Sequence, residues 1–261
     1  MQDLLHLGKT TFAQKLGVQL TLTGYNPITI SMDNYFKERC DTPIGEDGKF
    51  NFECIEALDV DLFNSHMKAL IEGKEIDMPI FDFYKGTKEY KQNYLKLKEN
   101  DILIIEGIHA LNPILTKFTD NKNKFRIYIS PIATLNIDDY TKVSTTDTRL
   151  LRRLVRDYVT RGHSVEKTFE LWKNVKAGEE KYIIPYIEVA DYIYNSSLIY
   201  EPGVIKTFAQ PLLLQLPRTS KYYSEARRLY GYLNNFLTIE TTNIPIDSIL
   251  REFIGNGCFY R

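Results

Sequence analysis

Gly8-Lys9-Thr10 matches the end of a phosphate-binding loop, whose full pattern is G-x-x-x-x-G-K-[ST]. In such a loop, backbone N–H groups surround phosphate oxygens, the lysine reaches the terminal phosphates and the hydroxyl ligates Mg²⁺. The first glycine would stand at position 3, where this chain has Asp3, and leucines fill positions 4, 5 and 7.

Two interpretations of this start of the chain compete. Either the first strand and glycines are missing and phosphate binding is impaired, or an unusual loop still offers its N–H groups. Bulky leucines resist a tight loop, which favours the first.

Two carboxylates follow apolar runs that read as buried strands. Glu106 ends "DILIIE", and Asp33 follows "PITISM". At the carboxyl edge of a parallel sheet, Glu106 could approach Mg²⁺ and a terminal phosphate, and Asp33 could accept the proton of an attacking hydroxyl. The alternative for each is an ordinary acid at a strand end or turn, where such residues are frequent.

A run of arginines shares one face of an expected helix over residues 148–161. Like charges this close repel one another unless an anion binds, and only Asp147 and Asp157 are near in sequence to offset them. The pattern predicts a phosphate-binding face, with a solvated or RNA-facing stripe as the alternative. Arg161 and Gly162 would let the chain turn and suit the hinge of a lid. The arginines at i, i+3, i+4 and i+7 are Arg149, Arg152, Arg153 and Arg156.

The elements that must position these residues alternate along the chain. Short β-branched runs separated by amphipathic stretches predict an α/β fold with a mostly parallel sheet covered by helices on both faces. We expect strands over residues 27–32, 101–106, 125–130 and 191–195. We expect helices over residues 11–20, 60–72, 148–161, 165–178 and 222–237, and a tail that packs back on the body.

Composition limits the partners and the compartment. Lys plus Arg (33) nearly balances Asp plus Glu (34), so no overall positive field favours nucleic acid or a membrane surface. The 3 cysteines lie far apart without metal-ligand spacing, which indicates a reducing, cytoplasmic compartment. No apolar run approaches the roughly 20 residues of a spanning helix, and no signal peptide is evident.

Four motifs together resemble the uridine kinase and phosphoribulokinase family. In chain order they are G-K-T-T-F, S-x-D-x-Y-F, I-I-E-G and T-D-x-R-L-x-R-R-x-x-R-D-x-x-x-R-G. The likeness is greatest to the kinase domain of bacterial-type uridine kinase-like proteins that carry a tRNA-synthetase-like module in front, and it extends to "SILREFIG" near the end. It implies a P-loop NTPase-type sheet with an arginine-rich helical lid and the first strand missing. It also implies a kinase domain over residues 1–221, with residues 222–261 as a C-terminal helix and tail packed on it.

The resemblance further implies ATP-dependent transfer of the γ-phosphoryl group to the ribose 5'-hydroxyl of a nucleoside such as uridine or cytidine. Asp33 would be the general base, and Thr10 and Glu106 would organise Mg²⁺. Lys9 would hold the β- and γ-phosphates. The other ATP-binding residues would be Gly8, Thr10 and Thr11 in the loop and Arg152, Arg153, Arg156 and Arg161 in the lid.

On the acceptor side, Glu53 stands where the family places an aspartate that binds the sugar hydroxyls. Phe52, Phe81 and Arg153 complete the expected substrate contacts. The chain departs from the family at Tyr84-Lys85-Gly86, where uridine-cytidine kinases have a histidine that reads the pyrimidine. A second lid arginine is also replaced, by His163.

Because of these departures, the base that the chain recognises stays open. Three other functions of the chain stay open as well. The chain could phosphorylate another small alcohol, such as a phosphorylated sugar or pantothenate. It could bind nucleotide or nucleoside without transfer, or it could bind RNA through the arginines, which the neutral net charge weakens. Whether the chain assembles into a homo-oligomer also stays open.

Overall fold

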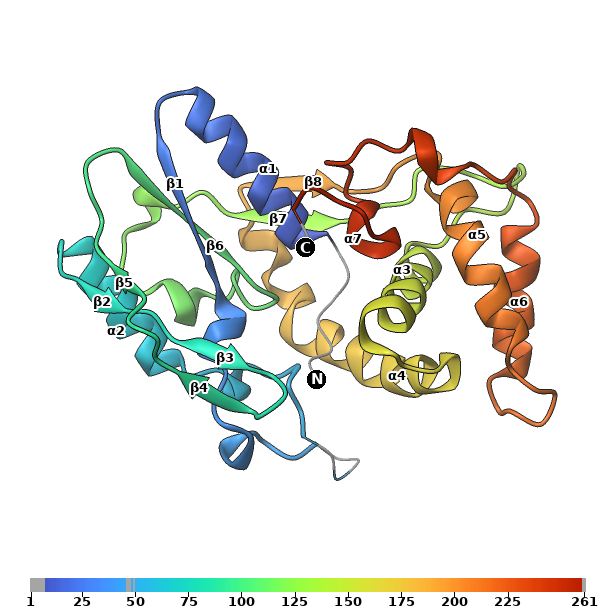
Figure 1. Cartoon of the computed structure of the whole chain (residues 1–261), viewed down its shortest axis with the longest axis horizontal. Helices are drawn as coiled ribbons and strands as arrows, with labels where there is room; N and C mark the ends of the chain where they lie inside the picture. The colour runs from blue at the N-terminus through green and yellow to red at the C-terminus, as the bar shows by residue number, and fades with distance from the viewer. Residues whose placement is uncertain (1–7, 46–47, 49, 260–261) are drawn as a thin grey trace. The chain divides into compact units, whose positions relative to one another are not determined.

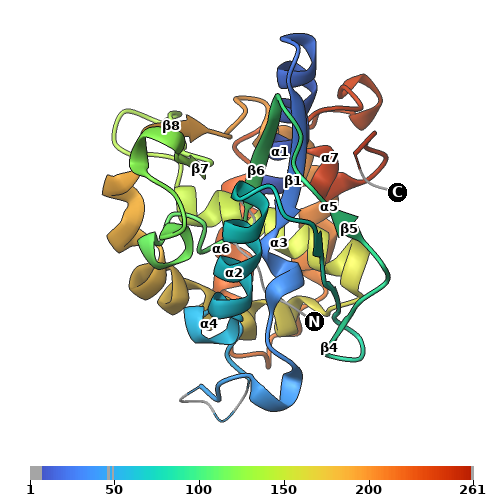
Figure 2. The ribbon, with the colours of Figure 1, turned by 90° about the vertical axis from the view of Figure 1, so that its left-hand side faces the viewer.

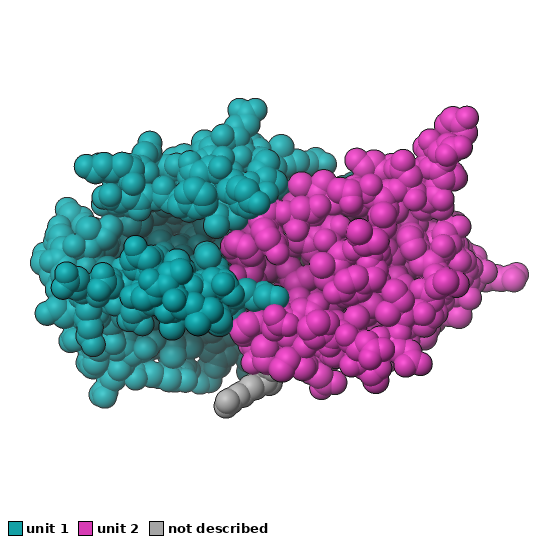
Figure 3. Space-filling model, turned by 90° about the horizontal axis from the view of Figure 1, so that it is seen from above, with its two compact units in different colours: residues 1–4, 13–128, 174–193 teal, residues 5–12, 129–173, 194–261 magenta. Residues whose placement is uncertain are grey.

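The computed structural model describes residues 8–45, 48 and 50–259 (Figure 1). The loop expected before Gly8, with Asp3 and the leucines at positions 4, 5 and 7, lies outside the described residues. The chain divides into two compact units, coloured teal and magenta in Figure 3. Among the described residues, unit 1 comprises those within 13–128 and 174–193, and unit 2 comprises those within 8–12, 129–173 and 194–259.

Several elements run from one unit into the other: α1 (Lys9–Leu22), β7 (Ile127–Ser130), α4 (Val165–Tyr182) and β8 (Tyr192–Asn195). The helix and strands within unit 1 are β1 (Asn26–Ser31), α2 (Val60–Ile71), β2 (Ile76–Asp77), β3 (Ile80–Asp82), β4 (Thr87–Glu89), β5 (Tyr94–Leu95) and β6 (Asp101–Glu106). Its 3-10 helices are η1 (Met32–Tyr35), η2 (Arg39–Asp41), η3 (Ile55–Ala57), η4 (Pro113–Thr116), η5 (Asn121–Asn123) and η6 (Ile184–Val189). Unit 2 contains α3 (Thr145–Arg161), α5 (Glu201–Leu214), α6 (Tyr223–Leu233), η7 (Thr241–Asn243) and α7 (Arg251–Ile254).

The parallel pair β1–β6 is the centre of unit 1, and helices cover both of its faces. Alternate side chains of a strand point to opposite faces. Pro27 and Ile104 face α1, where Gly17 lies 3.6 Å and 3.9 Å from them, measured from an added Cβ. Ile28 and Ile30, on the other face, join the core that α2 builds. The prediction of an α/β fold with a parallel sheet between helices is therefore confirmed.

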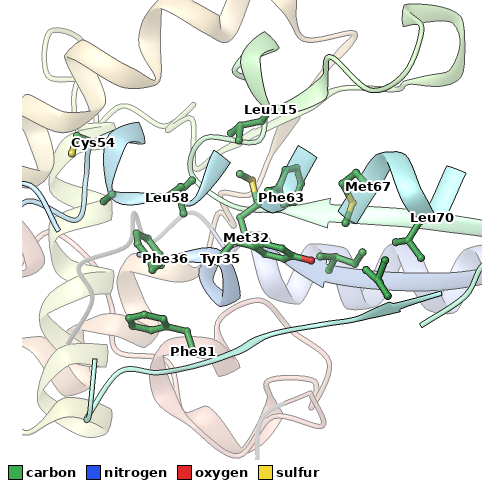
Figure 4. Packing of buried hydrophobic residues seen from close by; sticks show 13 residues of the cluster. Met32, Tyr35, Phe36, Cys54, Leu58, Phe63, Met67, Leu70, Phe81 and Leu115 are labelled. Carbon is green, nitrogen blue, oxygen red and sulfur yellow. The ribbon is translucent and has the colours of Figure 1, made fainter. Parts of the chain in front are cut away.

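The core of unit 1 forms where α2 packs against the end of β1 and the turn after it (Figure 4). Asp59 caps the start of α2, and its carboxylate accepts a hydrogen bond from the Leu62 N–H at 3.1 Å. Phe63, Met67 and Leu70 follow at helical spacing and are at most 1% exposed. Figure 2 views unit 1 from the side of α2. The Tyr35 ring packs edge-on against Phe63 at 5.0 Å, so this core fixes the chain just beyond β1.

The antiparallel pairs β2–β5 and β3–β4 were not expected from the sequence. Their strands are only 2 or 3 residues long, too short for an alternating pattern to stand out. Gly86 closes the β3–β4 turn with φ of +76°, and its N–H donates to the Asp82 carbonyl at 2.7 Å. A Cβ on Gly86 would lie 2.7 Å from Arg39 Nε, so only glycine allows this approach.

In unit 2, α3 packs against α5 and α7, and α5 packs against α6. α3 begins earlier than expected, because the Ser144 hydroxyl accepts a hydrogen bond from the Asp147 N–H at 3.2 Å and caps the helix. It ends at Gly162, in the left-handed conformation with φ of +64°, so the predicted turn after Arg161 is confirmed. α6 stops at Leu233 rather than 237, because the Asn235 side chain donates to the carbonyls of the last turn.

α5 was not expected from the sequence. Pro202, Gly203 and Pro211 resemble helix breakers, yet Pro202 lies in the first turn, where its missing N–H costs nothing. Within the described ranges, no helix combines the length and apolar character needed to cross a bilayer.

Candidate active site

Ser31 and Glu106, the last residues of β1 and β6, are partners in the parallel ladder. Ser31 then caps η1, its hydroxyl accepting a hydrogen bond from the Asp33 N–H at 3.4 Å. Both strands leave the sheet at the same edge, so Glu106 stands at the end of one strand and Asp33 follows the end of its neighbour. Both carboxyl residues are half-buried. The structure thus places these two acids where the sequence expected them, and their chemical roles stay predictions.

The two strand ends approach each other unusually closely. A Cβ added to Gly107 would lie 2.7 Å from Met32 Cβ, which no real side chain tolerates without a shift. Met32 is only 2% exposed and belongs to the core of unit 1, so it has little room to move. Gly107 is therefore required for the chains that carry Asp33 and Glu106 to leave the sheet side by side.

The expected acceptor residues are tied to the same turn within unit 1. The Asn34 side chain, next to Asp33, accepts a hydrogen bond from the Phe81 N–H at 3.3 Å. Phe81 and Phe52 both pack on the Phe36 ring, with centroid distances of 5.9 Å and 6.0 Å. Phe81 is 5% exposed and belongs to the core cluster, so it contributes packing there, whereas Phe52 is half-buried.

Glu53 is a buried carboxylate, only 6% exposed, that lies against α4. A Cβ added at Gly178 would lie 2.7 Å from Glu53 Cβ, so the helix can approach this closely only with glycine there. The sequence predicted that this helix ends near Gly178, but α4 continues to Tyr182. Gly178 is a packing position rather than a helix end, a distinction that periodicity alone does not make.

In unit 2, α1 begins directly after Gly8, whose φ of +78° turns the chain into the helix. The first helical bond joins the Phe12 N–H to the Gly8 carbonyl at 3.0 Å. Lys9 and Thr10 are half-buried in this first turn. Thr11 is fully buried, and its hydroxyl donates to Glu252 at 2.9 Å. The G-K-T residues therefore stand at a helix start, the position that phosphate binding requires.

The arginines on one face of α3 contact different partners. Arg152 is fully buried and donates both to Glu201, at 2.5 Å and 2.6 Å, and to the Ser196 carbonyl at 2.8 Å. The Arg149 guanidinium lies over the Trp172 ring, 5.7 Å from its centroid. Both side chains are at most 4% exposed, which excludes the solvated stripe for them.

The remaining arginines gather around Asp157, which is itself fully buried. Arg153 Nε lies 3.1 Å from its carboxylate, Arg156 3.3 Å and Arg161 3.2 Å. His163 is also near, with Nδ1 3.8 Å away. Burial, followed by the charge of Arg161, lowers the pKa of Arg156 to about 10. Three guanidinium groups around one carboxylate form a cationic cluster near the end of α3.

The expectation that only Asp147 and Asp157 offset the arginines was wrong. Glu201 supplies the carboxylate for Arg152 from 49 residues away, and no local pattern signals a partner at that separation. Asp147 instead accepts a bidentate pair of hydrogen bonds from Arg228, each at 2.7 Å. Sequence reasoning also missed Glu252, the partner of Thr11.

Comparison with known proteins agrees with these motifs. The family model of the Phosphoribulokinase / Uridine kinase family matches residues 7–198. A uridine kinase of Halobacterium salinarum is 29% identical over 187 residues, covering 71% of this chain and 74% of that protein. One of Ligilactobacillus salivarius is 30% identical over 188 residues, covering 71% and 78%. One of Borreliella burgdorferi is 30% identical over 211 residues, covering 78% and 90%.

The fold also has a solved counterpart. A protein proposed to be a fructose transport system kinase, from Silicibacter sp. TM1040, superposes with a TM-score of 0.52 at 19% identity, covering 73% of this chain and 85% of that one. At this identity the likeness supports the fold alone. With the family match over most of the chain, the conclusion is that this chain belongs to the phosphoribulokinase and uridine kinase family and is a phosphotransferase with an alcohol acceptor.

Proposed function

We propose that the chain transfers the γ-phosphoryl group of ATP to the ribose 5'-hydroxyl of a nucleoside of the uridine or cytidine type. The observation that carries this proposal is the shared strand-end edge of unit 1, where Ser31 pairs with Glu106 and Asp33 follows. The relatives named uridine kinase favour a nucleoside as the acceptor.

On the acceptor side, the proposal assigns Asp33 as general base and Glu53 as the group that binds the sugar hydroxyls. A buried carboxylate such as Glu53 suits a pair of hydroxyl donors, because both of its oxygens accept hydrogen bonds. Phe52, half-buried beside it, offers an apolar surface for the sugar or base. Phe81 supports this group through the shared Phe36 ring.

On the ATP side, the proposal assigns Gly8, Lys9, Thr10 and Thr11 to the phosphates. The helix start supplies N–H groups and Lys9 supplies a positive charge. Arg153, Arg156 and Arg161 form the cationic cluster of α3 that would neutralise phosphate charge. Arg152, also expected there, is held by Glu201, so its contribution would be to fix α3 in place.

We propose that Mg²⁺ binds through Thr10 and Glu106, because hydroxyl and carboxylate oxygens are the hard ligands that this ion prefers. Each residue is half-buried in its own unit, and Glu106 ends a strand. Among the described residues, no cluster of three or more His, Cys, Asp or Glu forms a dedicated metal cage. Mg²⁺ commonly binds through one or two protein oxygens together with substrate phosphates and water. When bound, Mg²⁺ would neutralise charge on the phosphate oxygens.

The proposed reaction balances without a further reactant. The acceptor oxygen forms a bond to the γ-phosphorus, the bond from that phosphorus to the bridging oxygen breaks, and ADP leaves. The hydroxyl proton passes to Asp33 and from there to solvent. Catalysis then depends on positioning and charge neutralisation rather than on a covalent intermediate. We also propose a cytoplasmic location, which the free thiols of Cys40, Cys54 and Cys258 support.

A steady-state acceptor panel tests the proposal. Purified chain with Mg·ATP is offered uridine, cytidine, adenosine, ribulose 5-phosphate and pantothenate, and ADP release is measured. We expect the highest kcat/KM with uridine or cytidine, and loss of turnover in Asp33→Asn. A higher kcat/KM with ribulose 5-phosphate or pantothenate would replace the nucleoside. ATP binding without turnover of any acceptor would indicate a binding protein instead.

A further inference from the structure

The C-terminal segment of residues 248–254 packs inside unit 2 rather than lying on its surface. Leu250 and Phe253 have no exposed area, and Ser248, Ile249, Arg251 and Ile254 are at most 9% exposed. Glu252 is the one half-exposed residue of this segment. The partly buried carboxylate of Glu252 is stabilised by a partner, because removing part of a charge from water is costly without one.

Contacts of the two neighbouring residues hold Glu252 in place. The Arg251 guanidinium donates to the carbonyls of Thr241 at 2.9 Å and Ile244 at 2.5 Å, which fixes the segment to the chain before it. The Phe253 ring lies under the Arg152 guanidinium of α3, 5.1 Å from its centroid. The backbone of Glu252, which lies between Arg251 and Phe253, is therefore held in a fixed position.

Glu252 contacts the start of α1. Its Oε2 accepts the hydrogen bond from the fully buried Thr11 hydroxyl at 2.9 Å. The preceding turn of the segment also lies against Gly8, where an added Cβ would be 2.1 Å from Ile249 Cδ1 and 3.9 Å from Glu252 Oε2. The conformation of Gly8, with φ of +78°, and its lack of a side chain are both needed for this contact.

Glu252 also acts on the arginine cluster of α3. Its negative charge raises the pKa of Arg156, against the lowering by burial and by Arg161. The Arg156 side chain is 13% exposed, so a carboxylate nearby matters more than it would in water. The Glu252 carboxylate thus forms a hydrogen bond with the start of α1 and interacts electrostatically with Arg156 of α3.

We infer that Glu252 is a positioning residue of the ATP site, which holds the first turn of α1 in the arrangement that phosphate binding requires and whose negative charge acts on Arg156. The inference rests on the proposed function. It adds Glu252, from the C-terminal segment, to the residues that are proposed for ATP binding. Groups fixed before the ligand arrives lose less entropy on binding, which is the physical advantage of such a carboxylate.

Glu252→Ala is the main test, with Glu225→Ala as the matched control, because Glu225 is an exposed carboxylate of α6 in the same unit that pairs with Arg228. The binding of Mg·ATP is measured by titration and the acceptor KM by ADP release. Hydrogen exchange of the amides of residues 9–12 is measured without nucleotide. Glu252→Gln, which keeps an acceptor oxygen for Thr11 but no charge for Arg156, serves if the alanine variant does not fold.

We expect Glu252→Ala to weaken ATP binding about tenfold, the size of one lost hydrogen bond to a charged group, with the acceptor KM unchanged. We expect exchange at residues 9–12 to become faster, Glu252→Gln to show a smaller loss of ATP affinity, and Glu225→Ala to match the wild type. Unchanged or tighter ATP binding in Glu252→Ala would overturn the inference. So would an equal loss of ATP and acceptor affinity, which indicates general unfolding. A wild type that binds no ATP would overturn the proposed function itself, and the inference with it.

Discussion

Ser31 and Glu106 are direct partners in the parallel ladder of β1 and β6, and Asp33 is bonded through its N–H to the Ser31 hydroxyl. A ladder fixes the relative position of its strands along their length, so the chain has little freedom in where these acids emerge. In this respect the edge of the β1–β6 pair differs from a single strand that ends in an acid. Two carboxylates follow one edge of a sheet, and the core under Met32 holds them there.

Asp33→Asn should lower phosphoryl transfer at least about a hundredfold, because it removes the proposed proton acceptor. ATP binding should stay close to that of the wild type, since the proposed phosphate contacts are not altered. Initial rates of ADP release and a parallel ATP titration measure the two effects. Asp61→Asn, on the exposed surface of α2, is the control and should leave both unchanged. Equal turnover by the wild type and Asp33→Asn would remove Asp33 from the mechanism.

Lys9→Ala should weaken ATP binding by about tenfold or more, because it removes a charge-assisted contact to the phosphates. In wild type, Mg·ATP should raise the melting temperature, since a ligand of the native state stabilises it by mass action. Lys9→Ala should need correspondingly more ATP for the same rise. Lys15→Ala, exposed on the same helix, is the comparison. Identical melting curves for the two variants at every ATP concentration would contradict a phosphate role for Lys9.

Gly178→Ala should raise the acceptor KM and destabilise the fold by about 1–3 kcal/mol, because the new methyl group would press on Glu53. Denaturant unfolding and acceptor kinetics measure the two effects. Gly231→Ala in α6 is a matched helical glycine with nothing within 4 Å of an added Cβ. It should be neutral or stabilising by up to about 1 kcal/mol. If both variants unfold at the same denaturant concentration, the close approach of α4 to Glu53 is not real.

Glu201→Gln should destabilise the chain by about 3–5 kcal/mol, because it leaves the buried charge of Arg152 without its carboxylate. The exposed pair of Arg228 with Glu225 offers the contrast, since Glu225→Gln should cost less than about 1 kcal/mol. Urea unfolding with intrinsic fluorescence gives both free energies. A Glu201→Gln variant as stable as Glu225→Gln would show that Arg152 does not depend on Glu201.

The strand of residues 101–106 could be predicted with its bounds, because a short apolar run that ends in an acid and a glycine has few other interpretations. The helix of the arginine motif was equally clear, and Ser144 adds only its first turn. Local signals of this kind depend on spacing within one element. They can therefore be recognised in the sequence when nothing else about the fold is known.

The long-range partners could not be predicted in the same way. Glu201 and Glu252 carry no local pattern that marks them as partners of Arg152 and Thr11, and 241 residues separate Thr11 from Glu252. α5 was hidden by Pro202, which the first turn of a helix tolerates, and by Pro211, which lies inside the helix where a proline normally argues against one. The roles of Lys9, Thr10, Asp33 and Glu106 rest on motif and placement, and they stay predictions until they are tested.

Identification of the reaction product is the most direct test of phosphoryl transfer to a nucleoside. The chain is incubated with Mg·ATP and uridine, and the products are followed by ³¹P NMR with an Asp33→Asn sample beside it. We expect ADP and uridine 5'-monophosphate to appear in equal amounts with the wild type, and neither to accumulate with the variant. ATP that stays intact, or a phosphate on any position other than the 5'-oxygen, would contradict it.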